Sequence, residues 1–112
     1  MTKPKTKIPY GRQKIDNDDI EAVVRVLSAD FITTGPVTEK FENRLAKFVS
    51  TKFAASCSSG TAALHLAVRA LQIKTHDLVV VPTITFLATA NAPRYVGADV
   101  LFCDVDPDTG LI

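Results

Sequence analysis

One uninterrupted apolar run, Leu78 to Val81, constrains the fold of this chain more than any other feature. Three of its four residues are valine, and a β-branched run without polar alternation is typical of a parallel strand covered on both faces. Helical patterns precede and follow it, at residues 60–73 and at the alanine-rich residues 86–95, and a second strand-like run occupies residues 100–105. Alternating strands and helices predict right-handed crossovers and an α/β fold with mainly parallel strands.

The region before residue 60 contains two further helical patterns and one short apolar segment. Apolar residues recur at helical spacing over residues 17–28, after a capping residue at Asp16 or Asn17. A loop then leads to a helix that starts at Pro36, since proline suits the first helical turn. Phe53–Cys57 is short, small and apolar, which predicts a buried strand, and the next helix is expected to turn one face inward. The residues expected on that face are Leu64, Ala67, Val68 and Leu71.

Composition excludes several classes of function. The chain has 112 residues, 46% of them hydrophobic, and a net charge of +1, which fits one small globular domain and gives no argument for nucleic acid or a membrane surface. No apolar run is long enough to span a bilayer, and no secretory signal is recognisable. Cys57 and Cys103 end apolar runs and are expected to be buried free thiols in the cytoplasm. No cysteine–histidine cluster suggests a metal site, and His65 and His76 are expected to be satisfied or solvent-facing.

Two polar turns are the candidate functional elements. Ser58–Ala62 opens one helix and Thr83–Phe86 opens the next. Both turns follow predicted strands, and ligands of α/β sheets bind beyond the carboxyl ends of the strands. Free amides at a helix N-terminus attract phosphate. Taken alone, the first turn is equally compatible with an anion site and with close packing, and Phe86 is more often a core residue than a stacking platform.

The order of several short motifs is more specific than any one of them. The motifs are Ile8-Pro9-Tyr10-Gly11, Thr33-Thr34-Gly35-Pro36, Ser58-Ser59-Gly60-Thr61-Ala62-Ala63-Leu64, Thr85-Phe86 and Asp104-Val105-Asp106-Pro107-Asp108-Thr109-Gly110. In this order they resemble the N-terminal part of the DegT/DnrJ/EryC1/StrS family of sugar aminotransferases, which use pyridoxal 5′-phosphate. The resemblance is strongest to the branch that aminates C4 of UDP-linked 4-keto-6-deoxy-hexosamines in pseudaminic acid synthesis. It implies the large domain of a fold type I transferase, a three-layer αβα architecture with mainly parallel strands.

The resemblance also implies roles for individual residues. Gly60, Thr61 and Ala62 are expected to hold the cofactor phosphate, and Phe86 is expected to stack on its pyridine ring. The substrate side is expected to involve five residues: Tyr10, Asp30, Phe31, Ile32 and Thr33. The implied partners are a nucleotide-linked keto sugar, an amino donor such as glutamate, and a second copy of the chain in a homodimer.

The family's reaction needs a Schiff-base lysine, which in the family lies downstream of the Asp-Pro-Asp-Thr-Gly segment. None of Lys40, Lys47, Lys52 and Lys74 stands in the family's sequence context for that lysine. We therefore expect no catalytic residue in this chain, an N-terminal arm at residues 1–15, and a truncated large domain at residues 16–112. We also expect the chain to be inactive alone and to expose sheet edges and apolar helix faces.

Alternatives from other classes stay open at this point. One is a sugar dehydratase of the same family, in which the lysine is replaced. Another is a non-catalytic domain that binds a phosphate ligand or a homologous chain. An unrelated nucleotide-binding module is disfavoured because the sequence has neither a P-loop nor a Gly-x-Gly-x-x-Gly motif. The carboxylates Asp104, Asp106 and Asp108 are interpreted as turn residues, because the later glutamate of a calcium loop is missing.

Overall fold

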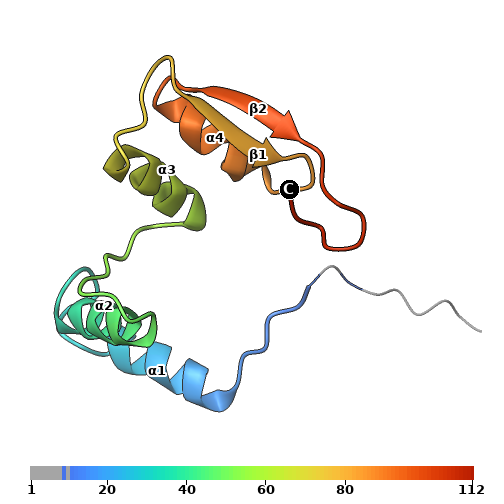
Figure 1. Ribbon diagram of the computed structural model, residues 1–112. Coiled ribbons are helices and arrows are strands. Elements are labelled where there is room, and N and C mark those ends of the chain that lie inside the picture. The colour runs from blue at the N-terminus through green and yellow to red at the C-terminus, as the bar shows by residue number, and fades with distance from the viewer. Residues whose placement is uncertain (1–8, 10) are drawn as a thin grey trace, which may run out of the picture. The chain divides into compact units, whose positions relative to one another are not determined.

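The computed structural model describes Pro9 and residues 11–112, and the chain divides into two units (Figure 1). The first unit ends at Ala54 and the second begins at Ala55. Each unit has its own secondary structure and is described by itself. The candidate cofactor residues all belong to the second unit.

The first unit contains two helices, as predicted. Helix α1 spans Asn17–Leu27 and helix α2 spans Pro36–Phe48. Asp16 caps α1 through a reciprocal box, in which the Asp19 amide donates to the Asp16 carboxylate at 3.3 Å and the Asp16 amide donates to the Asp19 carboxylate at 3.1 Å. Gly35 precedes α2 with a φ of 97°, a conformation that glycine adopts without strain. The predicted turn chemistry before Pro36 therefore sets the start of α2.

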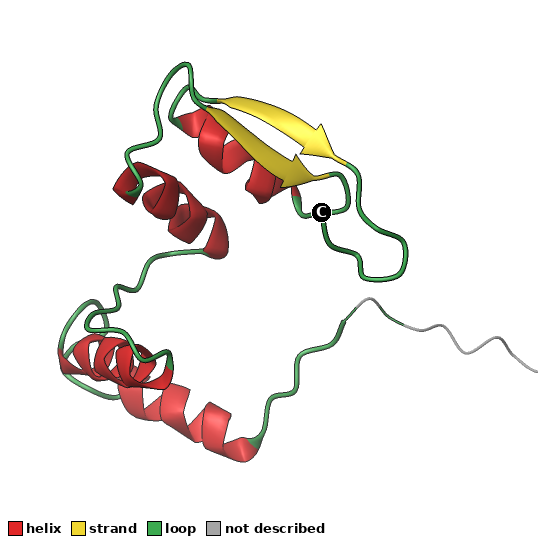
Figure 2. Ribbon diagram, viewed as in Figure 1, coloured by secondary structure: helices red, strands yellow, loops and turns green. Residues whose placement is uncertain are grey.

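The second unit is a parallel two-stranded sheet with two helices. Strand β1 spans Leu78–Pro82 and strand β2 spans Asp99–Cys103, and Val79 is in register with Val100. Helix α4, Leu87–Tyr95, connects the strands and packs against both of them (Figure 2). Helix α3, Gly60–Ala70, packs against α4. The predicted α/β class with parallel strands is confirmed.

Small side chains form the centre of the second unit. Ala88, Ala92 and Ala98 are buried together with Val81, and Pro93 is also fully buried. Because alanine has little bulk, α4 lies close to the sheet. This close packing fixes the direction of α4, and so fixes the position of its N-cap residue Phe86 beyond the carboxyl end of β1.

The prediction of a strand at Phe53–Cys57 is wrong. These residues have no regular secondary structure, and the sheet described by the structure contains only β1 and β2. A strand is stable only when a neighbouring strand pairs with its backbone, and the sheet that the structure describes does not include this segment. It also contains alanine and serine, which are not strong strand formers. The division between the two units falls inside it, after Ala54.

Fewer side chains of the sheet, of α3 and of the cysteines are buried than the sequence predicts. One face of the sheet is open, since Leu78, Val80 and Leu101 share it and are 60%, 48% and 51% exposed. Leu64, Ala67 and Leu71 are exposed on α3, and only Val68 of the expected inward face is half-buried. Both cysteines are free thiols as expected, but both are exposed. All these deviations have one cause: the covering elements that the expectations assumed are not supplied by the described residues.

His65 also differs from its expectation. Its ring meets Tyr95 edge to face, with 5.4 Å between ring centroids, and so links α3 to α4. The Nε2 atom is buried and has no hydrogen-bond partner among the described residues. The histidine is therefore held by packing rather than by hydrogen bonds at that nitrogen.

Candidate functional site

The N-terminus of α3 is built around a serine cap. Ser59 is extended, with φ −164° and ψ 163°, and its hydroxyl accepts a hydrogen bond from the Ala62 amide at 3.1 Å. The Ser59 carbonyl accepts from the Ala63 amide at 3.0 Å. The Gly60 and Thr61 amides are left without an acceptor among the described residues. Two donors therefore remain available at the positive end of the helix.

The electrostatics of this helix end favour an anion. The first turn of α3 contains no acidic side chain. By contrast, the first turn of α1 contains Asp18 and Asp19, which complement the dipole of that helix. The partial positive charge at Gly60 and Thr61 is thus uncompensated by any carboxylate of its own helix.

An open pocket of about 630 Å³ lies beside these amides. It is predominantly apolar, and helix α3 contributes most of its wall. Phe86 and Ala88 close the pocket from the start of α4. The Phe86 side chain is 76% exposed, so its ring is accessible to a ligand. The two residues with unbonded amides and an accessible aromatic residue therefore line the same hollow.

The loop that carries Phe86 is tied to the sheet at its first residue. The Thr83 amide donates to the Cys103 carbonyl at 2.9 Å, and the Thr83 hydroxyl lies 3.4 Å from the Asp104 carboxylate. The loop therefore leaves β1 in a direction that is fixed by the end of β2. It reaches α4 at Phe86, which is the N-cap residue of that helix.

The structure brings three of the four predicted cofactor residues together, because Gly60, Thr61 and Phe86 all line the pocket. Ala62 does not line it, and its amide already donates to Ser59. Sequence reasoning missed the role of Ser59. A serine directly before a helical run is the usual signal of an N-cap, and that signal was present.

The predicted substrate residues lie in the first unit. Asp30, Phe31, Ile32 and Thr33 are all exposed in the loop between α1 and α2. Phe31 lies against Gly35, where an added Cβ would stand 3.0 Å from the Phe31 Cβ. Tyr10 lies outside the described residues.

The carboxylates after β2 form a turn, as predicted. Asp106 accepts hydrogen bonds from the Thr109 amide at 2.8 Å, the Asp108 amide at 3.0 Å and the Thr109 hydroxyl at 3.1 Å. These donors, the Thr109 amide foremost, lower the pKa of the Asp106 carboxyl below its ordinary value of 3.8. No group of three or more metal-ligating side chains comes together within the described part of the chain.

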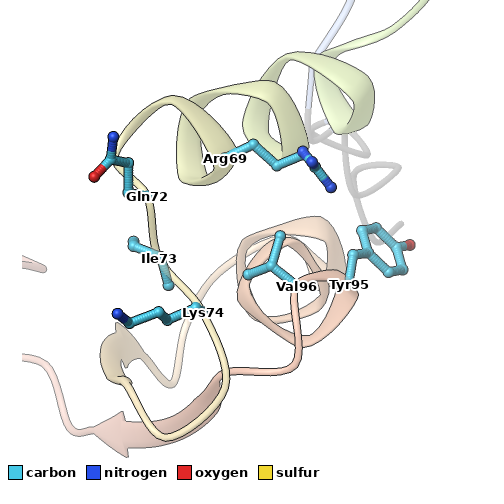
Figure 3. A pocket seen from close by; sticks show the side chains of 6 residues that line it. All are labelled: Arg69, Gln72, Ile73, Lys74, Tyr95 and Val96. Carbon is cyan, nitrogen blue, oxygen red and sulfur yellow. The ribbon is translucent and has the colours of Figure 1, made fainter.

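A second hollow, of about 420 Å³, lies at the other end of α3 and does not form a comparable site. Its lining includes Arg69 and Lys74, but Figure 3 shows their charged ends pointing in different directions. The Gln72 amide also points away from Arg69 (Figure 3). Because these polar groups do not converge, they offer no common point for a ligand.

Comparison with known proteins identifies the family to which the chain is similar. Residues 13–112 match the DegT/DnrJ/EryC1/StrS aminotransferase family. A UDP-4-amino-4,6-dideoxy-N-acetyl-beta-L-altrosamine transaminase of Campylobacter jejuni is 41% identical over 104 residues, which are 93% of this chain and 27% of that protein. The chain thus spans about a quarter of the length of the curated relatives it matches. Within the described residues, no helix has the length and apolar character needed to cross a membrane.

Solved structures agree in fold. The pyridoxal-phosphate form of a putative sugar aminotransferase from Streptococcus pneumoniae, Spr1654, superposes with a TM-score of 0.81 at 36% identity, covering 93% of this chain and 26% of that one. An Escherichia coli GDP-4-keto-6-deoxy-D-mannose-3-dehydratase with bound hydrated pyridoxal phosphate reaches a TM-score of 0.82 at 27% identity, covering 93% and 28%. With its parallel strands, its helix order and a family match over residues 13–112, this chain belongs to the DegT/DnrJ/EryC1/StrS aminotransferase family.

Proposed function

We propose that this chain holds the phosphate and ring of pyridoxal 5′-phosphate for a sugar aminotransferase. The observation that carries the proposal is the pocket shared by Gly60, Thr61 and Phe86. Two unpaired amides at a helix N-terminus suit a phosphate dianion, and an exposed aromatic ring suits a flat heteroaromatic ring. The amides and the aromatic side chain among the described residues therefore fit the phosphate and the pyridine ring of this cofactor, respectively.

The chain's own residues bind and orient in this proposal. Pyridoxal phosphate, when bound, supplies the electron sink that amino transfer requires. Gly60 and Thr61 donate main-chain hydrogen bonds to the phosphate, and the Thr61 hydroxyl adds a further donor. Phe86 excludes water from one face of the ring and limits its tilt. The Ser59 cap keeps the α3 terminus rigid while these contacts form.

The proposed substrate is a nucleotide-linked keto sugar, UDP-4-keto-6-deoxy-hexosamine, with glutamate as the amino donor. The similarity to the Campylobacter jejuni transaminase supports this assignment. Tyr10 and the exposed loop residues Asp30, Phe31, Ile32 and Thr33 are proposed to meet the substrate. Exposed apolar and polar groups in one loop suit contacts with a base and a sugar, respectively.

We also propose that these 112 residues do not transaminate alone. No lysine is among the described residues that line the pocket. Amino transfer needs a base that moves a proton at the reacting carbon, and a lysine usually provides it. In this proposal, residues 1–15 act as an arm and residues 16–112 as part of a large domain.

The assembly and compartment belong to the same proposal. We propose a homodimer, supported by the open apolar face of the sheet at Leu78, Val80 and Leu101. We propose a cytoplasmic location, supported by the free, exposed thiols of Cys57 and Cys103, which suit a reducing compartment.

A second candidate is a pyridoxal-phosphate-dependent sugar dehydratase. The superposition on the Escherichia coli dehydratase favours it, because the TM-score of 0.82 is as high as that of the aminotransferase. The pocket fits either reaction, since both use the same cofactor. Incubating the complete enzyme with a nucleotide-linked keto sugar separates them: an amino sugar supports the aminotransferase, and a deoxygenated sugar supports the dehydratase.

Titration of the chain with pyridoxamine 5′-phosphate tests the proposed cofactor site. This probe keeps the phosphate and the ring but cannot react with surface lysines, unlike the aldehyde. Phe86→Ala should weaken binding about threefold to tenfold, because it removes one stacking contact. Phe53→Ala is the matched control, since Phe53 is 78% exposed and outside the pocket. Equal affinities for both variants, or no saturable binding by the wild type, would contradict the proposal. A non-catalytic domain that binds only phosphate would bind inorganic phosphate as tightly as the probe.

A further inference from the structure

Two threonines, one before and one after Phe86 in the sequence, form a hydrogen bond between their hydroxyl groups. The side-chain oxygens of Thr85 and Thr89 lie 2.9 Å apart and share a hydrogen bond. Thr85 directly precedes Phe86, the N-cap residue of α4, and Thr89 stands in the first turn of that helix. The Thr89 amide also donates to the Phe86 carbonyl at 3.0 Å. Thr89 therefore holds both the Phe86 backbone and the residue before it.

Packing does not hold the Phe86 ring. Among the described residues, the side chain is 76% exposed. A ring with so little contact can be oriented only through its backbone or by a ligand. The first turn of α4 holds the Phe86 backbone in place, because Ala88 in that turn is buried in the core and only 4% exposed.

We propose that the Thr85–Thr89 hydroxyl pair is a positioning device that sets the Phe86 ring at the pocket wall for a flat heteroaromatic phosphate ligand. The inference rests on the proposed function, since it assumes that such a ligand enters this pocket. Neither threonine lines the pocket, so both act through Phe86 rather than by contact with the ligand. Without the hydroxyl bond, the Thr85–Phe86 backbone moves more freely, and the ring loses its preset orientation.

If the hydroxyl pair has only a structural role, a different experimental result is expected. Threonines in the first turn of a helix often form local hydrogen bonds that stabilise the helix end and do nothing more. In that case, removing a hydroxyl lowers helix stability but leaves the affinity of ligands for the folded protein unchanged. Ligand affinity and its dependence on Phe86 therefore separate the two roles.

The test uses isosteric variants of the chain and two readouts. Thr89→Val and Thr85→Val each remove one hydroxyl and keep the side-chain shape, whereas Thr89→Ser keeps the hydroxyl. The first readout is the ¹⁵N relaxation of the Phe86 amide without ligand. The second is the dissociation constant of pyridoxamine 5′-phosphate, measured in the wild-type and in the Phe86→Ala background. Thermal unfolding of every variant verifies that the folded state is populated.

We expect both valine variants to increase the mobility of the Phe86 amide and to weaken the probe about threefold to tenfold. Thr89→Ser should retain most of the wild-type affinity. In the Phe86→Ala background, Thr89→Val should weaken the probe no further, because the ring through which it acts is gone. An unchanged Phe86 amide in both valine variants overturns the inference, and so does an equal loss of affinity in both backgrounds.

The same experiment distinguishes failure of the proposed function. If the wild-type chain does not bind the probe, the proposed function fails and the ligand-positioning role fails with it, whatever the relaxation data show. If the wild type binds the probe, Phe86→Ala weakens it and Thr89→Val does not, the proposed function stands and only the role of the hydroxyl pair is overturned.

Discussion

At the scale of single residues, the proposed phosphate contacts come mainly from the main chain rather than from side chains. Gly60 and Thr61 contribute amides, and Ser59 uses its hydroxyl on Ala62 and leaves those two amides open. Side-chain substitutions in this turn, other than at Thr61, should therefore change the affinity for phosphate little. A substitution that deletes an amide should affect it strongly.

Gly60→Pro tests this directly. Proline suits the first position of a helix, and the extended conformation of Ser59 is one that a residue before proline adopts readily. The helix should persist, but one charge-assisted hydrogen bond to phosphate is lost. We expect pyridoxamine 5′-phosphate to bind about tenfold or more weakly in a fluorescence titration.

Gly60→Ala is the matched control for that variant. An added Cβ at Gly60 meets nothing within 4 Å, so alanine fits and keeps the amide. Affinity close to that of the wild type is expected for alanine. If alanine and proline weakened the probe equally, the amide of Gly60 would not be a phosphate donor.

Asp106 gives a prediction about pH. Its folded-state pKa lies below the ordinary 3.8, because Thr109 and Asp108 donate hydrogen bonds to the carboxylate. A lowered pKa means that the turn is stabilised above the unfolded-state pKa, and that this contribution is lost as the pH falls through the folded-state pKa. A carboxyl-carbon NMR titration should place the Asp106 midpoint below 3.8. A midpoint at or above that value would contradict the turn geometry.

At the scale of elements, the two faces of β1 should differ sharply in their tolerance of substitution. Val81 is 2% exposed on the face that α4 covers, whereas Val80 is 48% exposed on the open face. Val81→Ala removes buried methyl groups and leaves a cavity, which should cost about 2 kcal/mol in the free energy of unfolding. Val80→Ala should cost well under half as much. Chemical denaturation measures both, and equal costs would mean that α4 does not cover this face.

The elements were largely predictable from the sequence, because local patterns determine them. Helical spacing predicted α1, α2 and α3, with a capping residue at the start of α1 and Pro36 at the start of α2. An alanine-rich run predicted α4, and the valine run predicted β1. The strand prediction for Phe53–Cys57 was wrong because a strand also needs a partner strand, and the sequence pattern of one segment does not reveal whether a partner is present. The prediction that Leu64 and the two cysteines are buried was wrong for the same reason, because the exposure of a side chain depends on which other segments cover it.

The candidate site was predictable in part. The meeting of the α3 start with Phe86 was expected from two turns that follow parallel strands. No strand precedes the first of these turns among the described residues, and it is the packing of α3 against α4 that brings Gly60 and Thr61 to the same pocket as Phe86. The hydrogen bond between Thr85 and Thr89 was not expected, because a contact between two hydroxyls depends on the local backbone path. The sequence likewise did not predict which amides at the start of α3 donate to Ser59 and which do not.

At the scale of the whole molecule, the exposed apolar surface should drive self-association. Val80 and Leu101 are register partners on the open face of the sheet, and Leu78 extends the same patch. Apolar patches of this kind bind partners or aggregate. Sedimentation velocity at micromolar concentration should detect dimers or larger species of the chain.

Replacing Val80 and Leu101 together with threonine should shift that distribution toward the monomer, because threonine keeps the strand preference and removes apolar area. Ile84→Thr is a suitable control, since Ile84 is 78% exposed but lies in the loop after β1. A monodisperse monomer for the wild type would contradict the expectation, and so would an unchanged distribution for the double variant.

The open amides at the start of α3 have a consequence for how occupancy of the pocket can be observed. Main-chain amides exchange their protons with water, and an amide that has no acceptor exchanges fast, whereas one that donates to a bound phosphate exchanges slowly. Deuterium uptake at Gly60 and Thr61 should therefore fall when a phosphate ligand binds, while uptake at the already bonded Ala62 changes little. Hydrogen exchange at two adjacent peptide units would therefore report whether the pocket is occupied, without a chromophore and without catalytic turnover.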